Sequence, residues 1–140
     1  MRPKKLLIGA IAVLVIALLS VWAWQSWKAS EERRLDTAYA ELFPQSLPGI
    51  ENRYHSKTEA FTDTVVRYRF DGGSPSLVKQ LVRRFQLTPA EVPFRSSDPA
   101  PSWWAIPKGA DIYTRGHDQQ HVMLVFEPGS RRVFFERTQN

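Results

Sequence analysis

Two histidines, His117 and His121, have the spacing in this sequence that comes closest to that of a metal site. On a helix, side chains four residues apart lie on one face and can share an ion. Gly116, Asp118 and the strand-forming run after His121 argue against a helix here. In an extended segment, four residues span roughly 13 Å, which is too far for one ion. We therefore expect two histidines in a hairpin loop and no metal site.

Other residues that could carry chemistry are isolated. Asp63, Asp71 and Asp111 lie where aspartate commonly shapes turns, and no two carboxylates are spaced to share a helix face beside a cleft. Ser74 and Ser130 lack the surroundings of a nucleophile elbow, and there is no phosphate-binding glycine loop. The chain has no cysteine, which excludes disulfides and thiolate ligands. We predict no catalytic residue, no cofactor and no enzymatic activity.

Trp103 and Trp104 are the candidates for a partner-binding site. They lie in the segment 88–107, where repeated prolines forbid regular elements of any length. Two indoles carry enough apolar surface to favour an ordered segment. Their role is either a structural plug over the core or a binding anchor. Because adjacent residues of an extended loop point to opposite sides, we expect one buried and one exposed tryptophan.

An apolar run from Leu6 to Trp24 follows the basic start of the chain, and it contains no charge and no proline. Its nineteen residues would form a helix of roughly 28 Å, close to the hydrocarbon thickness of a bilayer. A cleaved signal sequence is the alternative, but the one passable cleavage site, at Ala23, is flanked by tryptophans. The residues expected at the membrane interface are Trp22, Trp24, Trp27 and Lys28.

These features predict four parts: a cytoplasmic tail (1–5), a transmembrane helix (6–27), a helical stalk (28–46) and an extracytoplasmic α+β domain (47–140). The basic residues flanking the span are balanced in number. The short tail also carries the terminal amine, and long domains are translocated largely regardless of charge, so we expect a cytoplasmic N-terminus. In a Gram-negative host, the protein would be a single-pass inner-membrane protein with a periplasmic domain, in contact with the bilayer through residues 6–27.

The formal charge of +5 does not indicate nucleic-acid binding. The first five residues supply three of the positive charges, which leaves 16 basic against 14 acidic residues in the rest of the chain. The arginine doublets are separated and interleaved with acids, and no basic helix or aromatic-basic motif is present. We interpret these charges as solvated faces.

Local patterns predict the elements of the outer domain. The segment 27–43 carries an apolar stripe that should dock on the domain, and nothing breaks a helix before Pro44. Ser74 is the expected N-cap of a helix that starts at Pro75 and ends near Gln86.

Residues 64–70 alternate as a half-buried strand, while 50–57 and 110–114 are further strand candidates. Residues 122–126 and 132–136 should form a hairpin, with the first strand central in the sheet. The fold class is α+β: a small antiparallel sheet of four or five strands with one packed helix.

Several short motifs resemble a broad group of small, uncharacterised Gram-negative membrane-anchored envelope proteins, some of which are lipoproteins or resemble immunity proteins. The motifs are Leu47-Pro48-Gly49-Ile50, Pro101-Ser102-Trp103-Trp104, Tyr113 and the closing pair MLVFEPGS and RRVFFE. The resemblance implies an envelope location and a non-enzymatic role, although the cysteine of a lipid anchor is missing. We therefore expect a membrane-anchored protein-interaction module with an unidentified protein partner.

Two alternatives stay open. One is an immunity protein that neutralises a toxin acting in the periplasm. The other is an enzyme or small-ligand binder whose site is assembled from the dispersed residues Arg67, Asp111, Tyr113 and His117.

Overall fold

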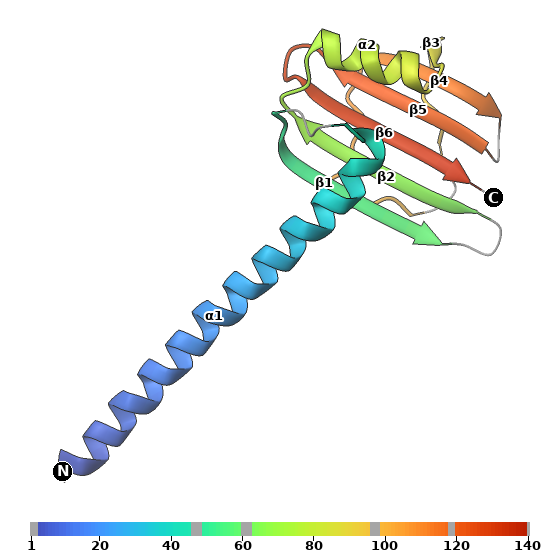
Figure 1. The fold of residues 1–140 in the computed structure, drawn as a ribbon. Helices are drawn as coiled ribbons and strands as arrows, with labels where there is room; N and C mark the ends of the chain where they lie inside the picture. Colours follow the sequence, from blue (N-terminus) through green and yellow to red (C-terminus); the bar gives the residue numbers. More distant parts are fainter. Residues whose placement is uncertain (1–2, 46–48, 60–62, 96–98, 118–119, 140) are drawn as a thin grey trace. The chain divides into compact units, whose positions relative to one another are not determined.

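The computed structural model describes residues 3–45, 49–59, 63–95, 99–117 and 120–139 (Figure 1). The expected boundary between stalk and domain, at residues 46 and 47, lies outside these ranges. The chain divides into two units, Met1–Thr37 and Ala38–Asn140, and each is described by itself. The second unit contains the whole sheet.

The first unit consists of one helix, α1, which extends from Pro3 to Leu42 and whose last turn belongs to the second unit. Its continuity confirms that nothing interrupts the helix before Pro44. Within the described residues, α1 alone is long and apolar enough to cross a membrane, and its most apolar window is fully exposed. A signal sequence near an N-terminus meets the same criterion of length and composition.

The second unit is built on a six-stranded antiparallel sheet with the order β1-β2-β6-β5-β4-β3. The strands are β1 Glu51–Glu59, β2 Thr64–Asp71, β3 Thr88–Ala90, β4 Asp111–His117, β5 Gln120–Glu127 and β6 Arg132–Gln139. The α+β class is confirmed, and β5 is central as expected, since it lies between β4 and β6. The expectation of four or five strands was wrong by one strand, β3.

The additional strand β3 lies within the proline-rich segment that was expected to be irregular. Pro89 pairs with Tyr113 of β4 in a strand of three residues at the edge of the sheet. An edge strand needs backbone donors on one side only, so the missing N–H of proline is tolerated there. The repeated prolines therefore prevent long helices or strands in this segment, but they do not prevent a three-residue edge strand.

The predicted helix is confirmed as α2, Pro75–Arg84, which lies across one face of the sheet (Figure 1). The Ser74 side chain accepts a hydrogen bond from the Leu77 amide at 3.1 Å, as an N-cap does. The apolar side of the helix buries Leu77, Val78 and Leu81. We call the side of the sheet that α2 covers the helix face, and the opposite side the loop face.

The last turn of α1 packs on the helix face. Tyr39 is fully buried with its ring edge-on to Tyr68 and Phe70 of β2, and its hydroxyl lies 2.7 Å from the Arg69 carbonyl and 2.8 Å from the Tyr54 carbonyl. The docking of the apolar stripe is therefore confirmed for the part of the stripe that belongs to this unit. The helix ends at Leu42 rather than at 46.

Arg84 of α2 binds the carboxyl end of α1 through the carbonyls of Glu41 and Leu42. A cation at this position donates hydrogen bonds to backbone carbonyls that have no partner within the helix. Its positive charge also offsets the negative end of the helix dipole.

The strand β2 differs from its expected half-buried state, because both of its faces are covered. Tyr68 and Phe70 are buried on the helix face, whereas Val65 and Arg67 are buried on the loop face. The loop face is covered by side chains of the segment between β3 and β4, including Phe94, Trp104 and Ile106. Alternation alone could not predict this cover, since it comes from residues distant in the sequence.

Candidate functional site

A cluster of charged and polar side chains is buried on the loop face, where β2, β6 and β5 lie side by side. Arg67 and Glu136 are directly opposite each other on β2 and β6, and the Arg67 Nε donates to Glu136 Oε2 at 2.8 Å. His121 Nε2 of β5 lies 2.7 Å from the other carboxylate oxygen. Arg67 and Glu136 are each 1% exposed and His121 is 3% exposed, so the carboxylate joins three strands inside the core.

The segment between β3 and β4 lies over this cluster. The Phe94 ring stacks on the His121 ring with centroids 4.6 Å apart, and the Arg67 guanidinium lies 5.6 Å from the centre of the Trp104 ring. Trp104 also meets Phe134 of β6 edge-on at 5.5 Å. The segment is thus held to the sheet by aromatic contacts with His121 and Arg67, two members of the cluster.

The geometry of His121 does not match that of a nucleophilic triad. In a triad, the carboxylate and the nucleophile use different ring nitrogens of the histidine. Here the Thr138 hydroxyl lies 3.2 Å from the same Nε2 that meets Glu136, while the buried Nδ1 has no hydrogen-bond partner among the described residues. A substrate would also have to displace the covering segment. The arrangement fits a structural ion pair that orders the loop better than it fits an active site.

Sequence patterns did not identify this cluster. The sequence patterns suggest Arg67 only as one member of a dispersed ligand site, and they give no role to Glu136. One signal was available: a carboxylate directly follows the buried run Val133, Phe134 and Phe135, and an arginine alternates with the apolar residues of another strand. Opposite charges in two strongly apolar strands indicate a buried pair, but only the strand register can show that they meet.

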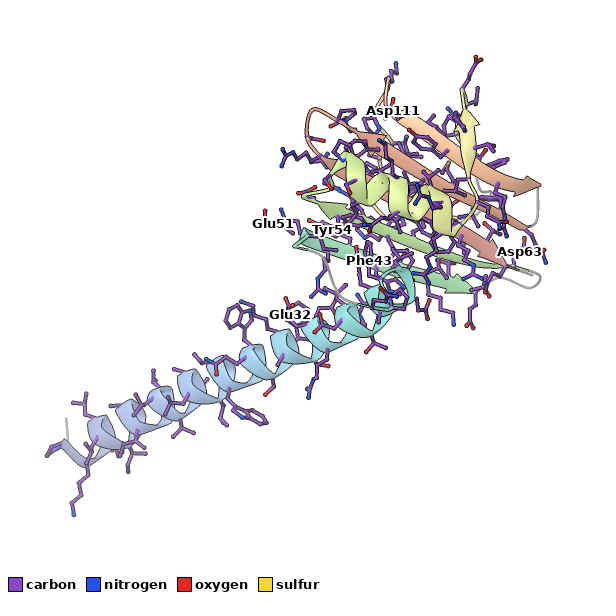
Figure 2. All side chains as sticks on the ribbon, turned by 45° about the horizontal axis from the view of Figure 1, so that its top comes forward. Glu32, Phe43, Glu51, Tyr54, Asp63 and Asp111 are labelled. Carbon is purple, nitrogen blue, oxygen red and sulfur yellow. The ribbon has the colours of Figure 1, made fainter. Side chains whose placement is uncertain are left out.

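The structure does not bring Arg67 together with Asp111 and Tyr113, three members of the hypothetical dispersed site. Arg67 aligns through Glu136 and Met123 with Thr114, so it is three strands away from β4, which carries Asp111 and Tyr113. Three strand spacings amount to roughly 14 Å. Figure 2 shows the same separation: Asp111 of β4 and Tyr54 of β1, the strand next to the β2 strand of Arg67, lie toward opposite edges of the sheet.

The two histidines are not both in a hairpin loop. His117 belongs to β4, where its backbone pairs with Gln120, whereas His121 is buried in β5. The side chain of His117 lies outside the described part of the structure. Among the described residues, no group of three or more histidine, cysteine, aspartate or glutamate side chains could hold a metal ion.

Trp103 and Trp104 are both half-buried, so the expectation of one buried and one exposed residue was wrong. The reason is local: the Trp104 amide donates to the Pro101 carbonyl at 2.9 Å, which closes a turn in place of the extended backbone that we assumed. Trp104 packs on the apolar core of the loop face. Trp103 instead contacts Tyr54 at the edge of the sheet, with ring centroids 5.5 Å apart.

Tyr54, Arg69 and Trp103 form a surface group that we call the aromatic platform. The Arg69 guanidinium lies 5.1 Å from the centre of the Tyr54 ring, and its Nη1 donates to the Trp103 carbonyl at 2.8 Å. Tyr54 is 38% exposed on the edge strand β1. The platform therefore combines exposed aromatic surface with a backbone position fixed by an arginine, which is typical of a binding anchor.

Two tyrosines on the helix face have altered acidity. Burial raises the pKa of Tyr39 above its ordinary value, because the phenolate would be poorly solvated. Burial also raises the pKa of Tyr68, and the negative charge of Glu41 adds to this effect. Both hydroxyls thus stay neutral and act in packing and hydrogen bonding.

The expected membrane-interface residues all lie on α1 in the first unit. Trp22, Trp24 and Trp27 are exposed, and the Lys28 ammonium lies 5.3 Å from the centre of the Trp24 ring.

No protein-family model, curated protein or solved structure matches this chain.

Proposed function

We propose that this protein is a single-pass inner-membrane protein whose periplasmic α+β domain is a non-enzymatic interaction module of the bacterial cell envelope. The observation that carries the anchoring is the continuity of α1. The exposed apolar run from Leu6 to Trp24 belongs to the same helix whose last turn buries Tyr39 and Leu42 in the sheet unit. A helix with this exposed apolar surface needs a lipid environment.

A retained anchor is favoured over a cleaved signal by the flanking residues. The cation over the Trp24 ring and the neighbouring exposed indoles have the composition of a membrane–water interface. The short basic tail favours a cytoplasmic N-terminus, which would place the sheet domain in the periplasm.

The aromatic platform is the proposed contact with a protein partner. Tyr54 is exposed and Trp103 is half-buried beside it, and the contacts of Arg69 fix both residues in place. Such preorganised aromatic residues dominate binding energy at interfaces. Trp104, by contrast, is engaged with Phe134 and Arg67. We therefore assign the binding role to Trp103 and the structural role to Trp104.

Anchoring and topology are tested together on the full-length protein. Intact mass of protein extracted from native membranes should correspond to the uncleaved chain of 16.1 kDa. A C-terminal alkaline phosphatase fusion should be active, and a C-terminal fluorescent fusion that folds only in the cytoplasm should be dark. Protein that begins near Trp24, or the opposite pair of reporter signals, would contradict the proposal.

The partner surface is tested by quantitative crosslinking in native membranes. Trp103→Ala should weaken capture of the partner by about thirtyfold, which corresponds to about 2 kcal/mol. Val92→Ala is the matched control, because this exposed apolar side chain has no place in the platform. Equal capture of the partner by Trp103→Ala and by the control would show that the aromatic platform is not part of the interface.

A further inference from the structure

Three arginines lie on the loop face of β2 and β6, and the strand register determines what each one meets. Arg67 is directly opposite Glu136 and binds its carboxylate. At the other end of the two strands, the Arg132 Nε lies 3.4 Å from a carboxylate oxygen of Asp71. Arg69 lies on β2 between these two ion pairs. Among the described residues, it is the one arginine of the three that has no carboxylate partner.

Aromatic rings lie on both sides of Arg69 where the other two arginines have a counter-ion. Its cross-strand neighbours are Tyr54 on β1 and Phe134 on β6, and its guanidinium lies 5.1 Å and 5.7 Å from the centres of their rings. Its Nη1 donates to the Trp103 carbonyl, which is a neutral acceptor. These contacts hold the guanidinium in place, but none of them balances its positive charge.

The guanidinium of Arg69 also has donors to spare. Within the described part of the chain, this side chain donates one hydrogen bond, to Trp103, and its buried Nε has no partner. The side chain is half-buried beside the exposed Tyr54, so water still reaches part of it in the free protein. A partner that covers Tyr54 and Trp103 would remove this water.

We propose that the protein partner of the aromatic platform places an aspartate or glutamate carboxylate on the Arg69 guanidinium. The inference rests on the proposed function, because it is the covering of Tyr54 and Trp103 that withdraws Arg69 from water. A desolvated cation without a counter-ion opposes binding. A carboxylate at the same place forms a charge-assisted hydrogen bond with the guanidinium and restores neutrality.

The surroundings of Arg69 favour a carboxylate over a phosphate group. One guanidinium balances the single charge of a carboxylate, whereas a phosphate monoester carries nearly two negative charges at neutral pH. Arg67, the next arginine along β2, is 1% exposed and already bound to Glu136. The loop-face residues of the adjacent strand β1 are uncharged, namely Tyr54, Ser56 and Thr58. The platform thus offers one positive charge between aromatic rings, which fits an acidic side chain.

Three peptides with blocked ends test this charge preference on the full-length protein in detergent. They are acetyl-Tyr-Glu-Tyr-amide and its counterparts with glutamine or phosphoserine in the middle. Binding is followed by the indole N–H signal of Trp103 in nuclear magnetic resonance spectra, which is assigned with Trp103→Phe. The glutamate peptide should bind about fivefold more tightly than the glutamine peptide, and more tightly than the phosphoserine peptide.

Substitution of Arg69 should change this preference. Arg69→Gln should bind the glutamate and glutamine peptides equally, whereas Arg69→Lys, which keeps the charge, should retain part of the preference. The ratio of the two affinities is the informative quantity, because a change in aromatic packing affects both peptides alike. The matched control is Arg83→Gln, which removes an exposed arginine from α2 on the helix face and should leave the ratio unchanged.

Four results would overturn the inference. They are equal affinities of the natural protein for the glutamate and glutamine peptides, tighter binding of the phosphoserine peptide, a ratio that Arg69→Gln does not change, and a Trp103 signal that no peptide shifts.

Capture of the partner in native membranes separates failure of this inference from failure of the platform itself. Arg69→Gln should weaken capture about tenfold. If Trp103→Ala lost capture while Arg69→Gln kept it in full, the platform would remain the interface and the carboxylate would be rejected. Full capture by both variants, equal to that of Val92→Ala, would reject the platform and the carboxylate together.

Discussion

Among the residues of the loop face, Glu136 is the one whose substitution should lower the free energy of unfolding most, because its carboxylate is buried and ion-paired. Glu136→Gln removes its charge and keeps its shape, so the Arg67 guanidinium stays 1% exposed without a counter-ion. Removing one partner of a buried ion pair costs about 3–5 kcal/mol. A second route gives a similar figure: the contacts with Arg67 at 2.8 Å and His121 at 2.7 Å are charge-assisted, at about 1.5–3 kcal/mol each.

Such a loss is a large share of the stability of a small domain, which is about 5–15 kcal/mol. Urea unfolding of the full-length protein in detergent, followed by near-ultraviolet circular dichroism, should show a lower midpoint with an unchanged slope. Hydrogen exchange should increase in the residues over the cluster, because Trp104 would lose its ordered cation. The matched control is Glu127→Gln, whose carboxylate accepts from Ser130 at the surface and should change stability by less than about 1 kcal/mol.

The reasoning would be refuted if Glu136→Gln and Glu127→Gln had equal, small effects. A double replacement, Arg67→Met with Glu136→Met, provides a further check. Because it removes both charges and keeps apolar volume, it should recover the part of the lost stability that comes from the unpaired Arg67 guanidinium, while His121 Nε2 keeps the Thr138 hydroxyl as a neighbour. Failure to recover would indicate that shape rather than charge compensation determines this site.

Three further predictions concern the tryptophans, the tyrosines and metal. Trp104→Ala should lower the free energy of unfolding by about 3 kcal/mol, whereas Trp103→Ala should lower it by about 1 kcal/mol, as measured in urea; equal effects would contradict the assigned roles. Burial raises the folded-state pKa of Tyr39, so its contribution to stability is fully present below about pH 10 and is lost as the pH rises through the folded pKa. The stability of Tyr39→Phe should therefore fall less steeply above pH 10 than that of the natural protein, and identical slopes would exclude this linkage. A chelator should leave the thermal midpoint unchanged, and a drop of several degrees would point to His121 as a metal ligand.

The elements that the sequence predicted are those with local signals. Residues 6–24 form a helix because a continuous apolar run contains no breaker, and α2 begins at Pro75 because Ser74 caps it. The hairpin of β5 and β6 follows from two apolar strands joined by a short turn. In each case the determining residues lie within a few positions of one another, so a pattern along the chain is sufficient.

The candidate site depended on contacts that no local pattern contains. Arg67 and Glu136 are 69 residues apart in the sequence, and their pairing follows from β6 lying beside β2. The same arrangement covers both faces of β2 and brings His121 to the second carboxylate oxygen. The sequence by itself determined the anchor-like helix, the capped helix and the central hairpin, because their hydrophobic and capping signals are local. Only the tertiary structure decided which charges are buried and which tryptophan contacts the core, because strand order and the cover of the loop face arise from packing between distant segments.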